Sequence, residues 1–257
     1  MDQFYFKEVS LLITHYNRSQ SLERLLNSFK AINCSFGEIV VSDDGANEEH
    51  KAKIVELQQS HNFSLVTTPI NKGLGNNLNK GQDAVGLPFT LYVQEDFVPA
   101  ADFGQHFADA FEIIKDRPDI DIVRFYAYFE YPYLKPYKNG FSEMEFRFWN
   151  SGYKKYYYYS DHPHLRRSGF LTKFGRYLEG ANVDVTEYHM MMSFLQKKGK
   201  AMFYVAFKSL FEQTNSSAEP STLKRNFWRE SKNPMIDMLR EVYRHLKFRY
   251  DYLFRKF

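Results

Sequence analysis

Short apolar runs alternate with helical patterns along the first hundred residues of the chain. Runs rich in β-branched and aliphatic residues are typical of buried strands, and they occupy residues 9–14, 38–42, 63–67 and 89–93. Apolar residues at helical spacing predict helices after Ser19, over 48–60 and over 78–85. Strands that alternate with helices indicate an α/β fold with parallel strands and right-handed crossovers.

Three of the predicted strands end in polar clusters. These are Thr-His-Tyr-Asn-Arg at 14–18, Asp-Asp-Gly at 43–45 and Gln-Glu-Asp at 94–96. In parallel α/β sheets ligands bind outside the carboxyl ends of the strands, so we expect the three clusters to form one rim. Asp-Asp-Gly by itself also fits a turn that caps a helix, but the convergence of all three favours a ligand site. Glu95 and Asp96 offer the oxygen ligands that Mg²⁺ or Mn²⁺ takes beside substrate phosphates.

A glycine-rich segment with a lysine, Asn-Lys-Gly-Leu-Gly-Asn-Asn at 71–77, lies between the second and third clusters. Glycine allows a ligand to approach the backbone closely, and Lys72 supplies a positive charge for a phosphate. The segment lacks the spacing of a P-loop, and its place in the chain excludes a dinucleotide-binding fingerprint. A structural turn remains the alternative interpretation.

In their order and spacing these motifs resemble the inverting glycosyltransferases of family 2, which have the GT-A fold. The resemblance covers residues 9–99. It rests on Thr14 with Tyr16, Asn17 and Arg18, on Ser-Asp-Asp-Gly-Ala at 42–46, on Asn71, Gly73, Gly75 and Asn79, and on 94–96. It implies a mostly parallel α/β sheet flanked by helices, in an enzyme that uses a nucleotide sugar.

The resemblance also implies roles for individual residues on the donor side. The residues implied to contact the nucleotide sugar are Thr14, Tyr16, Arg18, Asp43, Asp44, Lys72, Gln94 and Glu95. Asp96 takes the position of the family aspartate that binds a divalent cation, Mn²⁺ or Mg²⁺, bridging the donor diphosphate. Gln94 replaces an acid of the family triad, and Gln213 stands where metal-dependent members often carry a histidine. Both amides predict weaker metal binding than in such members.

A base is required because the acceptor hydroxyl loses its proton as the nucleoside diphosphate departs. In-line attack would invert the anomeric centre. In the family a Glu-Asp pair opens a helix and a glycine follows twelve positions after the glutamate. Glu187 precedes Gly199 by that spacing, so the resemblance makes Glu187 the base. Tyr188 replaces the second acid, and Asp184 is the reserve candidate. We expect these residues to open a helix over 190–198, and simple capping of that helix is the alternative.

Aromatic residues make up 18% of the chain, and its 19 tyrosines are concentrated between positions 125 and 159. In GT-A enzymes this region builds the acceptor side, where aromatic faces suit sugar rings. The expected acceptor-side residues are Tyr158, Asp161, His162, His164 and Arg166. A tyrosine-rich core with hairpins is the alternative, because tyrosine also favours β-strands.

The formal net charge of +3 is unevenly distributed. Residues 224–257 carry 10 basic and 4 acidic residues, a net of +6, which leaves the remainder at −3 and argues against a nucleic-acid partner. A helix from Pro234 would align apolar residues at positions 235, 239, 242, 246, 250, 253 and 257. That helix could lie on an anionic membrane surface, pack on the rest of the chain, or form a homodimer.

We therefore expect a GT-A domain over 1–222, with a donor half at 1–100 and an acceptor half at 101–222, followed by a basic amphipathic tail at 223–257. The chain has a single cysteine, Cys34, and no apolar run near 18 residues. We expect a cytoplasmic protein, peripheral on the inner face of the plasma membrane if the tail binds there.

The expected activity is transfer of a sugar, from a UDP-sugar by preference, to a hydroxyl of a glycan or lipid-linked glycan. Two other functions remain open. A catalytically silent glycan-binding or scaffold protein could keep the fold, and the substitutions at Gln94, Tyr188 and Gln213 favour it. A sugar nucleotidyltransferase would share the rim and Mg²⁺, but it needs a glycine-rich loop with Arg and Lys after the first strand, which this chain lacks.

Overall fold

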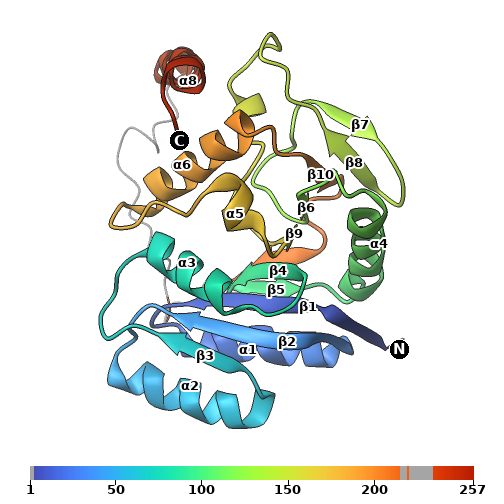
Figure 1. Ribbon diagram of the computed structural model, residues 1–257, viewed down its shortest axis with the longest axis vertical. Helices are drawn as coiled ribbons and strands as arrows, with labels where there is room; N and C mark the ends of the chain where they lie inside the picture. The colour runs from blue at the N-terminus through green and yellow to red at the C-terminus, as the bar shows by residue number, and fades with distance from the viewer. Residues whose placement is uncertain (1–2, 215–218, 220–233) are drawn as a thin grey trace.

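The computed structural model describes residues 3–214, 219 and 234–257. Within them the central feature is a nine-stranded mixed sheet (Figure 1). In spatial order its strands are β3 (Ser64–Thr67), β2 (Cys34–Asp43), β1 (Phe4–His15), β4 (Phe89–Gln94), β9 (His164–Arg167), β6 (Ile122–Arg124), β10 (Ala201–Tyr204), β8 (Phe141–Met144) and β7 (Leu134–Pro136). The strands from β3 to β4 are parallel, β9 is antiparallel to both its neighbours, and β10 is parallel to β6. β5 (Phe97–Pro99) and β11 (Phe211–Gln213) form a separate antiparallel pair.

Helices cover the sheet on both faces, and each face has its own buried apolar core (Figure 1). The helices of the first core are α1 (Ser19–Ala31), α2 (Glu48–His61) and α4 (Phe103–Asp116). Those of the second are α3 (Leu74–Ala84), α5 (Phe170–Phe174) and α6 (Val183–Gln196). Along β1, Leu11 and Ile13 join the first core and Leu12 joins the second. Burial on both faces explains the continuous apolar run in this strand.

The predicted α/β fold is confirmed, with local differences in where elements begin. β1 and β2 both start earlier than predicted, because Phe4 to Phe6 pair in parallel with Cys34 to Phe36. The ring of Phe6 lies 6.0 Å from that of Phe36 and 4.6 Å from that of Phe107 on α4. Aromatic packing against α4 therefore extends both strands beyond their apolar runs.

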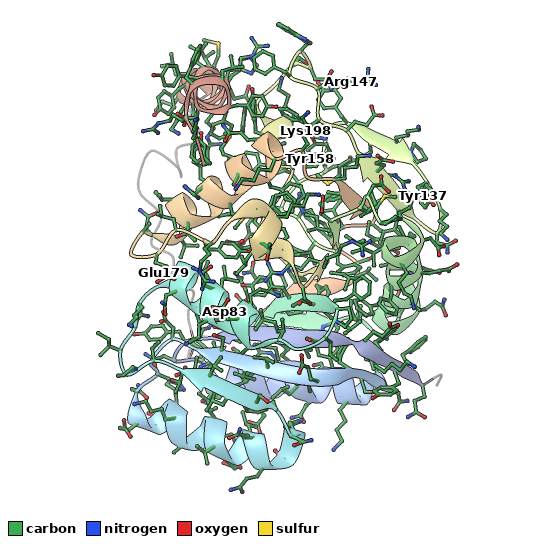
Figure 2. The ribbon with its side chains drawn as sticks, viewed as in Figure 1. Asp83, Tyr137, Arg147, Tyr158, Glu179 and Lys198 are labelled. Atoms are coloured by element: carbon green, nitrogen blue, oxygen red, sulfur yellow. The ribbon has the colours of Figure 1, made fainter. Side chains whose placement is uncertain are left out.

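The start of α3 also comes earlier than predicted. Gly73 precedes the helix with a φ of 87°, in the left-handed region that favours glycine. Gly75, in the first turn, lies against the backbone of Leu178, and a Cβ at this position would clash with the Leu178 carbonyl oxygen. The Asn79 amide donates to Glu179 at 2.8 Å, and Figure 2 shows Glu179 beside α3. The glycine-rich segment and the first turns of α3 therefore pack against the part of the chain that leads into α6.

The predicted start of α6 at 190 is wrong, because the helix begins at Val183. The Asn182 side chain caps it by accepting a hydrogen bond from the Val185 N–H at 3.0 Å. β-Branched residues, which have modest helix propensity, fill the first turn and conceal the helical pattern. As a result Glu187 lies within the helix instead of before it.

The C-terminal helix α8 (Pro234–Phe254) lies beside α6 (Figure 1). Phe248 is buried against the rings of Tyr156 and Tyr188, and the Tyr188 hydroxyl donates to Asp251 at 2.6 Å. The predicted tail helix is present, whereas the predicted domain boundary at 222/223 lies outside the described residues. In the part of the chain that the structure describes, no helix combines the length and apolarity needed to cross a membrane.

Candidate active site

A cavity of about 500 Å³ opens at the carboxyl ends of β1, β2 and β4. The N-terminus of α6 and the end of β11 contribute its other walls. The three polar clusters that the sequence predicts to form one rim all meet here. The residues that line the cavity are Thr14, His15, Tyr16, Arg18, Asp44, Asn71, Gly73, Leu74, Asn77, Gln94, Glu95, Asp96, Ala181, Asn182, Val183, Asp184 and Gln213.

Asp43 lies beneath the rim and holds it in shape. Its carboxylate accepts hydrogen bonds from His15 Nδ1 at 2.8 Å, from the Thr67 hydroxyl at 2.7 Å and from the Ala46 N–H at 3.1 Å. The Arg18 N–H donates to His15 Nε2 at 3.1 Å, which leaves the imidazole proton on Nδ1, facing Asp43. Burial raises the pKa of Asp43, but these hydrogen bonds outweigh it, so the net shift is downward. Asp43 therefore orients His15 and the start of α1 and does not line the cavity itself.

Asp44 fixes the glycine-rich loop. Its two carboxylate oxygens accept from the backbone N–H groups of Lys72 at 2.8 Å and Gly73 at 2.9 Å. Burial raises the pKa of Asp44, and these hydrogen bonds oppose the shift. The Lys72 side chain is exposed, and Lys72, unlike Asn71 and Gly73, does not line the cavity.

Asp96 contacts two side chains that line the cavity, Arg18 and Gln213. Arg18 Nη1 lies 3.2 Å from Asp96 Oδ2 and 3.6 Å from Glu95 Oε1. The Gln213 amide nitrogen donates to the same Asp96 oxygen at 2.9 Å. Burial, followed by the charge of Asp96, raises the pKa of Glu95 to about 8. One arginine thus faces two adjacent buried carboxylates.

The fold family implies a divalent cation at this position. The described residues contain no group of three or more His, Cys, Asp or Glu side chains arranged to hold a metal ion. However, Asp96 Oδ1 is buried and has no hydrogen-bond partner among the described residues, and the Glu95 carboxyl group adjoins it in sequence. Two carboxylates of this kind suit a cation that takes its other ligands from substrate phosphates and water. The residues therefore fit a cation shared with the donor, and they do not form a closed metal site.

Glu187 lies in a second, smaller cavity of about 80 Å³. Its carboxylate accepts from the Asp161 N–H at 3.1 Å. Burial, followed by the charge of Asp161, raises the pKa of Glu187 to about 8. The small cavity is lined by Arg124, Ala127, Tyr128, Phe129, Tyr131, Tyr157, Ser160, His162 and Glu187. Glu187 is therefore partly buried among aromatic side chains.

A hydrogen-bonded chain links the two cavities. The Tyr128 hydroxyl in the small cavity donates to Gln213 Oε1 at 3.1 Å, and Gln213 in turn donates to Asp96. Asp184 lies instead in the first turn of α6, exposed, and lines the large cavity. The structure thus separates the two candidate bases: Asp184 lines the cavity that contains Asp96, and Glu187 lines the adjoining one.

The residues expected on the acceptor side lie mostly in the core. The Tyr158 hydroxyl donates to the Met144 carbonyl at 2.6 Å, and Figure 2 shows Tyr158 close to α6. Asp161 accepts from the Tyr159 hydroxyl at 2.6 Å. Of the five expected residues, only His162 lines the small cavity. Burial, then the charge of Arg124, lowers its pKa to about 3, so the imidazole is neutral.

His164 and Arg166 both lie on β9, between β4 and β6 in the sheet. Both side chains are fully buried. The Arg166 guanidinium donates to Gln82 at 2.9 Å and to the Tyr177 hydroxyl at 2.7 Å. In this structure Arg166 anchors β9 to α3 and to the loop before α6.

Glu219 is a residue of the rim that the sequence analysis missed. Its carboxylate accepts from the backbone N–H groups of Gln20 at 3.0 Å and Ser21 at 2.9 Å, so it caps α1, whose own N-cap residue makes no side-chain cap. Its carbonyl accepts from Arg18 Nη2 at 3.2 Å. About two hundred residues separate Glu219 from α1, so no local sequence signal marks it. The sequence motifs include or adjoin His15, Asn71 and Asn77, but they do not indicate a role for any of these three residues.

A sheet that begins with parallel strands, a polar rim at their carboxyl ends, and buried acids after β4 are features of the GT-A fold. The Glycosyl transferase family 2 profile matches residues 10–175, and the chain belongs to this family. The predicted family is thereby confirmed.

Curated relatives match only part of the chain. A poly-beta-1,6-N-acetyl-D-glucosamine synthase of Staphylococcus epidermidis is 27% identical over 90 residues, which cover 35% of this chain and 22% of the synthase. The synthase of the same name from Staphylococcus aureus is 22% identical over 104 residues, 40% of this chain and 25% of the synthase. The match thus spans about a quarter or less of these relatives.

Solved structures share the fold over nearly the whole chain. S. aureus TarS, residues 1–349 in complex with UDP-GlcNAc, has a TM-score of 0.59 at 16% identity, covering 94% of this chain and 73% of that one. The mannosyltransferase PcManGT from Pyrobaculum calidifontis, in complex with GDP-Man and Mn²⁺, has a TM-score of 0.54 at 13% identity, covering 96% and 70%. At these identities the likeness shows the fold.

Proposed function

We propose that this chain transfers a sugar from a UDP-sugar to a hydroxyl of a glycan or lipid-linked glycan, with inversion at the anomeric carbon. The observation that carries the proposal is the large cavity, where the family motifs after β1, β2 and β4 meet in one rim. The relatives synthesise an N-acetylglucosamine polymer by name, and TarS is in complex with UDP-GlcNAc. UDP-GlcNAc is therefore the first donor to test.

The donor nucleotide would lie over the ends of β1 and β2. Thr14 and Tyr16 line this part of the cavity together with Asp44. Arg18, facing Asp96 at 3.2 Å, presents a guanidinium where the diphosphate would collect negative charge. Gln94 lines the same wall and has an amide that can bond a ribose hydroxyl.

The departing diphosphate needs positive charge beside it. A divalent cation, when bound, would neutralise part of that charge as a Lewis acid. Asp96 Oδ1 and the Glu95 carboxyl group are the groups that would hold it. Arg18 serves the same leaving group directly, so the site supplies cationic stabilisation from its own chain as well.

Glu187 is the proposed base for the acceptor hydroxyl. A carboxyl group with a pKa near 8 is a stronger base than an exposed one, and its cavity adjoins the donor cavity through Tyr128 and Gln213. The aromatic side chains that surround Glu187 would exclude water and contact the apolar face of an acceptor sugar. Asp184, on the donor cavity, remains the alternative base.

Ligand-induced thermal stabilisation and donor hydrolysis test the proposal without an acceptor. UDP-GlcNAc with Mn²⁺ should raise Tm and be hydrolysed slowly, because a ligand that binds only the folded state stabilises it. Asp96→Asn should lower the rate of donor hydrolysis by about tenfold or more, and it should also reduce the increase in Tm. Asp83→Asn, an exposed residue paired with Arg176, is the control and should behave as wild type.

GDP-, dTDP- and CMP-sugars measured in parallel report the nucleotide preference. If none of the nucleotide sugars raises Tm or is turned over with Mn²⁺ or Mg²⁺, the proposed transfer reaction is refuted. The expected cytoplasmic location remains a prediction from the sequence.

A further inference from the structure

One face of α8 is apolar and turned away from the rest of the protein. We call this the outer face. Each of its side chains is between 53% and 71% exposed: Met238, Leu239, Val242, Tyr243, Leu246, Tyr250, Leu253 and Phe254. Spaced at 100° per residue, they form one continuous stripe along the helix. Contiguous apolar surface of this kind marks an interaction site on a soluble domain.

The opposite face of α8 holds the helix in a fixed orientation. Phe248 and Asp251 are buried, at 5% and 2% exposure. The Gln196 side chain of α6 donates to the Tyr252 carbonyl at 3.0 Å and accepts from the Phe257 N–H at 3.2 Å. These contacts do not involve the outer face, and they set its direction away from α6.

Charge on α8 divides by sign. Between residues 238 and 257 the acids are Glu241 and Asp251, and neither belongs to the outer face. Asp251 lies beneath the helix, where Lys247 Nζ donates to it at 2.5 Å. The cations of the same stretch are Arg240, Arg244, Lys247, Arg249, Arg255 and Lys256. On the helical wheel Lys256 and Arg249 fall at one margin of the outer face, and Arg240 falls at the other.

We propose that α8 lies on an anionic lipid bilayer, with the outer face inserted among the acyl chains and the flanking cations at the headgroup phosphates. A broad apolar stripe bordered by Lys and Arg is the arrangement of helices that lie in the membrane interface. Each cation near such a surface adds attraction to anionic lipids. A second copy is the other possible occupant, but two outer faces placed together would bring cationic margins against each other.

This orientation has a consequence for the active site. α8 packs on α6 through Asp251 and Tyr188, and α6 carries both candidate bases. Membrane contact through the outer face would therefore hold the catalytic helix close to the lipid surface. The proposal itself stands on α8 alone and does not depend on the proposed sugar transfer.

Vesicle co-sedimentation of the full chain tests the proposal. Wild type should sediment with vesicles of phosphatidylcholine and phosphatidylglycerol and about tenfold less with phosphatidylcholine alone, and added salt should release it. Leu246→Glu/Leu253→Glu should lose binding by about tenfold or more, because charge in the outer face opposes insertion. Both residues are exposed, so the fold is preserved, and an unchanged Tm verifies this.

Val55→Glu is the matched control. Val55 is 51% exposed on α2, at the other end of the molecule from α8, and this change should leave vesicle binding intact (Figure 1).

Arg240→Gln/Lys256→Gln should reduce binding to the anionic vesicles only. The proposal is overturned if wild type does not bind anionic vesicles, or if the Leu246→Glu/Leu253→Glu variant binds them as well as wild type does. If wild type does not bind vesicles but is a dimer in light scattering, and the same variant is a monomer, the outer face would bind a second copy instead.

Discussion

The donor and base sides of the site are held in different ways. On the donor side, short hydrogen bonds between neighbouring strand ends position each group: Asp43 holds His15, and Asp44 holds the backbone of the glycine-rich loop. On the base side, Glu187 depends on one N–H donor, from Asp161, and on burial among aromatic rings. In the proposed reaction, a polar scaffold would position the donor, whereas a mainly aromatic one would adjust the acidity of the base.

This difference matters for catalysis because the two sides have different tasks. A nucleotide offers many polar atoms, so a rim of hydrogen-bonding groups can recognise it. A base has to take up a proton near neutral pH, and partial burial raises carboxylate pKa toward that range. The two scaffolds meet at Gln213, which contacts Tyr128 on one side and Asp96 on the other.

The largest expected effect comes from removing the base. Glu187→Gln should reduce sugar transfer by about 10²–10⁴-fold while UDP-GlcNAc still raises Tm, because donor contacts lie in the other cavity. Transfer kinetics and thermal shift measure the two effects separately. Glu112→Gln, an exposed residue on α4, is the control.

If Glu187→Gln retains transfer, the base is on the donor side after all. Asp184→Asn should then abolish it. A loss of donor binding in Glu187→Gln would show instead that the two scaffolds are not independent.

The pH profile of transfer sharpens the same comparison. The raised pKa of Glu187, about 8, leaves this group protonated at lower pH, and a protonated base cannot accept the acceptor proton. Transfer should therefore increase about tenfold per pH unit on the acid side of this pKa and level off above it. A profile that is flat from pH 6 to 8 would contradict Glu187 as the base and favour the alternative, Asp184.

The smallest effect is expected at the cap of α1. Glu219→Ala removes the carboxylate that accepts from Gln20 and Ser21 and should lower the free energy of unfolding by about 1–2 kcal/mol. Urea unfolding measures this change, with Glu130→Ala, an exposed residue, as the control. Since Arg18 donates to the Glu219 carbonyl, the KM for the donor should increase modestly. An unchanged urea midpoint would show that the cap is dispensable.

Sequence reasoning performed best where function depends on local motifs. The clusters at 14–18, 43–45 and 94–96 each follow one strand, and a general rule for parallel sheets places strand ends together. No knowledge of long-range contacts is needed to predict that rim. The start of α6 was predicted too late, because β-branched residues fill its first turn and weaken the helical pattern.

Residues whose surroundings come from distant segments could not be placed this way. His164 and Arg166 lie in a short strand between β4 and β6, and nothing near them in sequence predicts that order. Tyr158 belongs to a tyrosine-rich stretch that suits either a sugar or a core, and only the packing against α6 decides where its ring lies. Glu219 reaches α1 across most of the chain.

Gly75 determines how closely the glycine-rich loop approaches the segment that leads into α6. A Cβ atom at this position would lie 2.1 Å from the Leu178 carbonyl oxygen, in the segment that leads into α6. Even a methyl group would therefore force the glycine-rich loop and that segment apart. Gly75 belongs to a segment of the kind usually associated with phosphates, and here it keeps the proposed donor cavity close to α6, the helix that carries the proposed base.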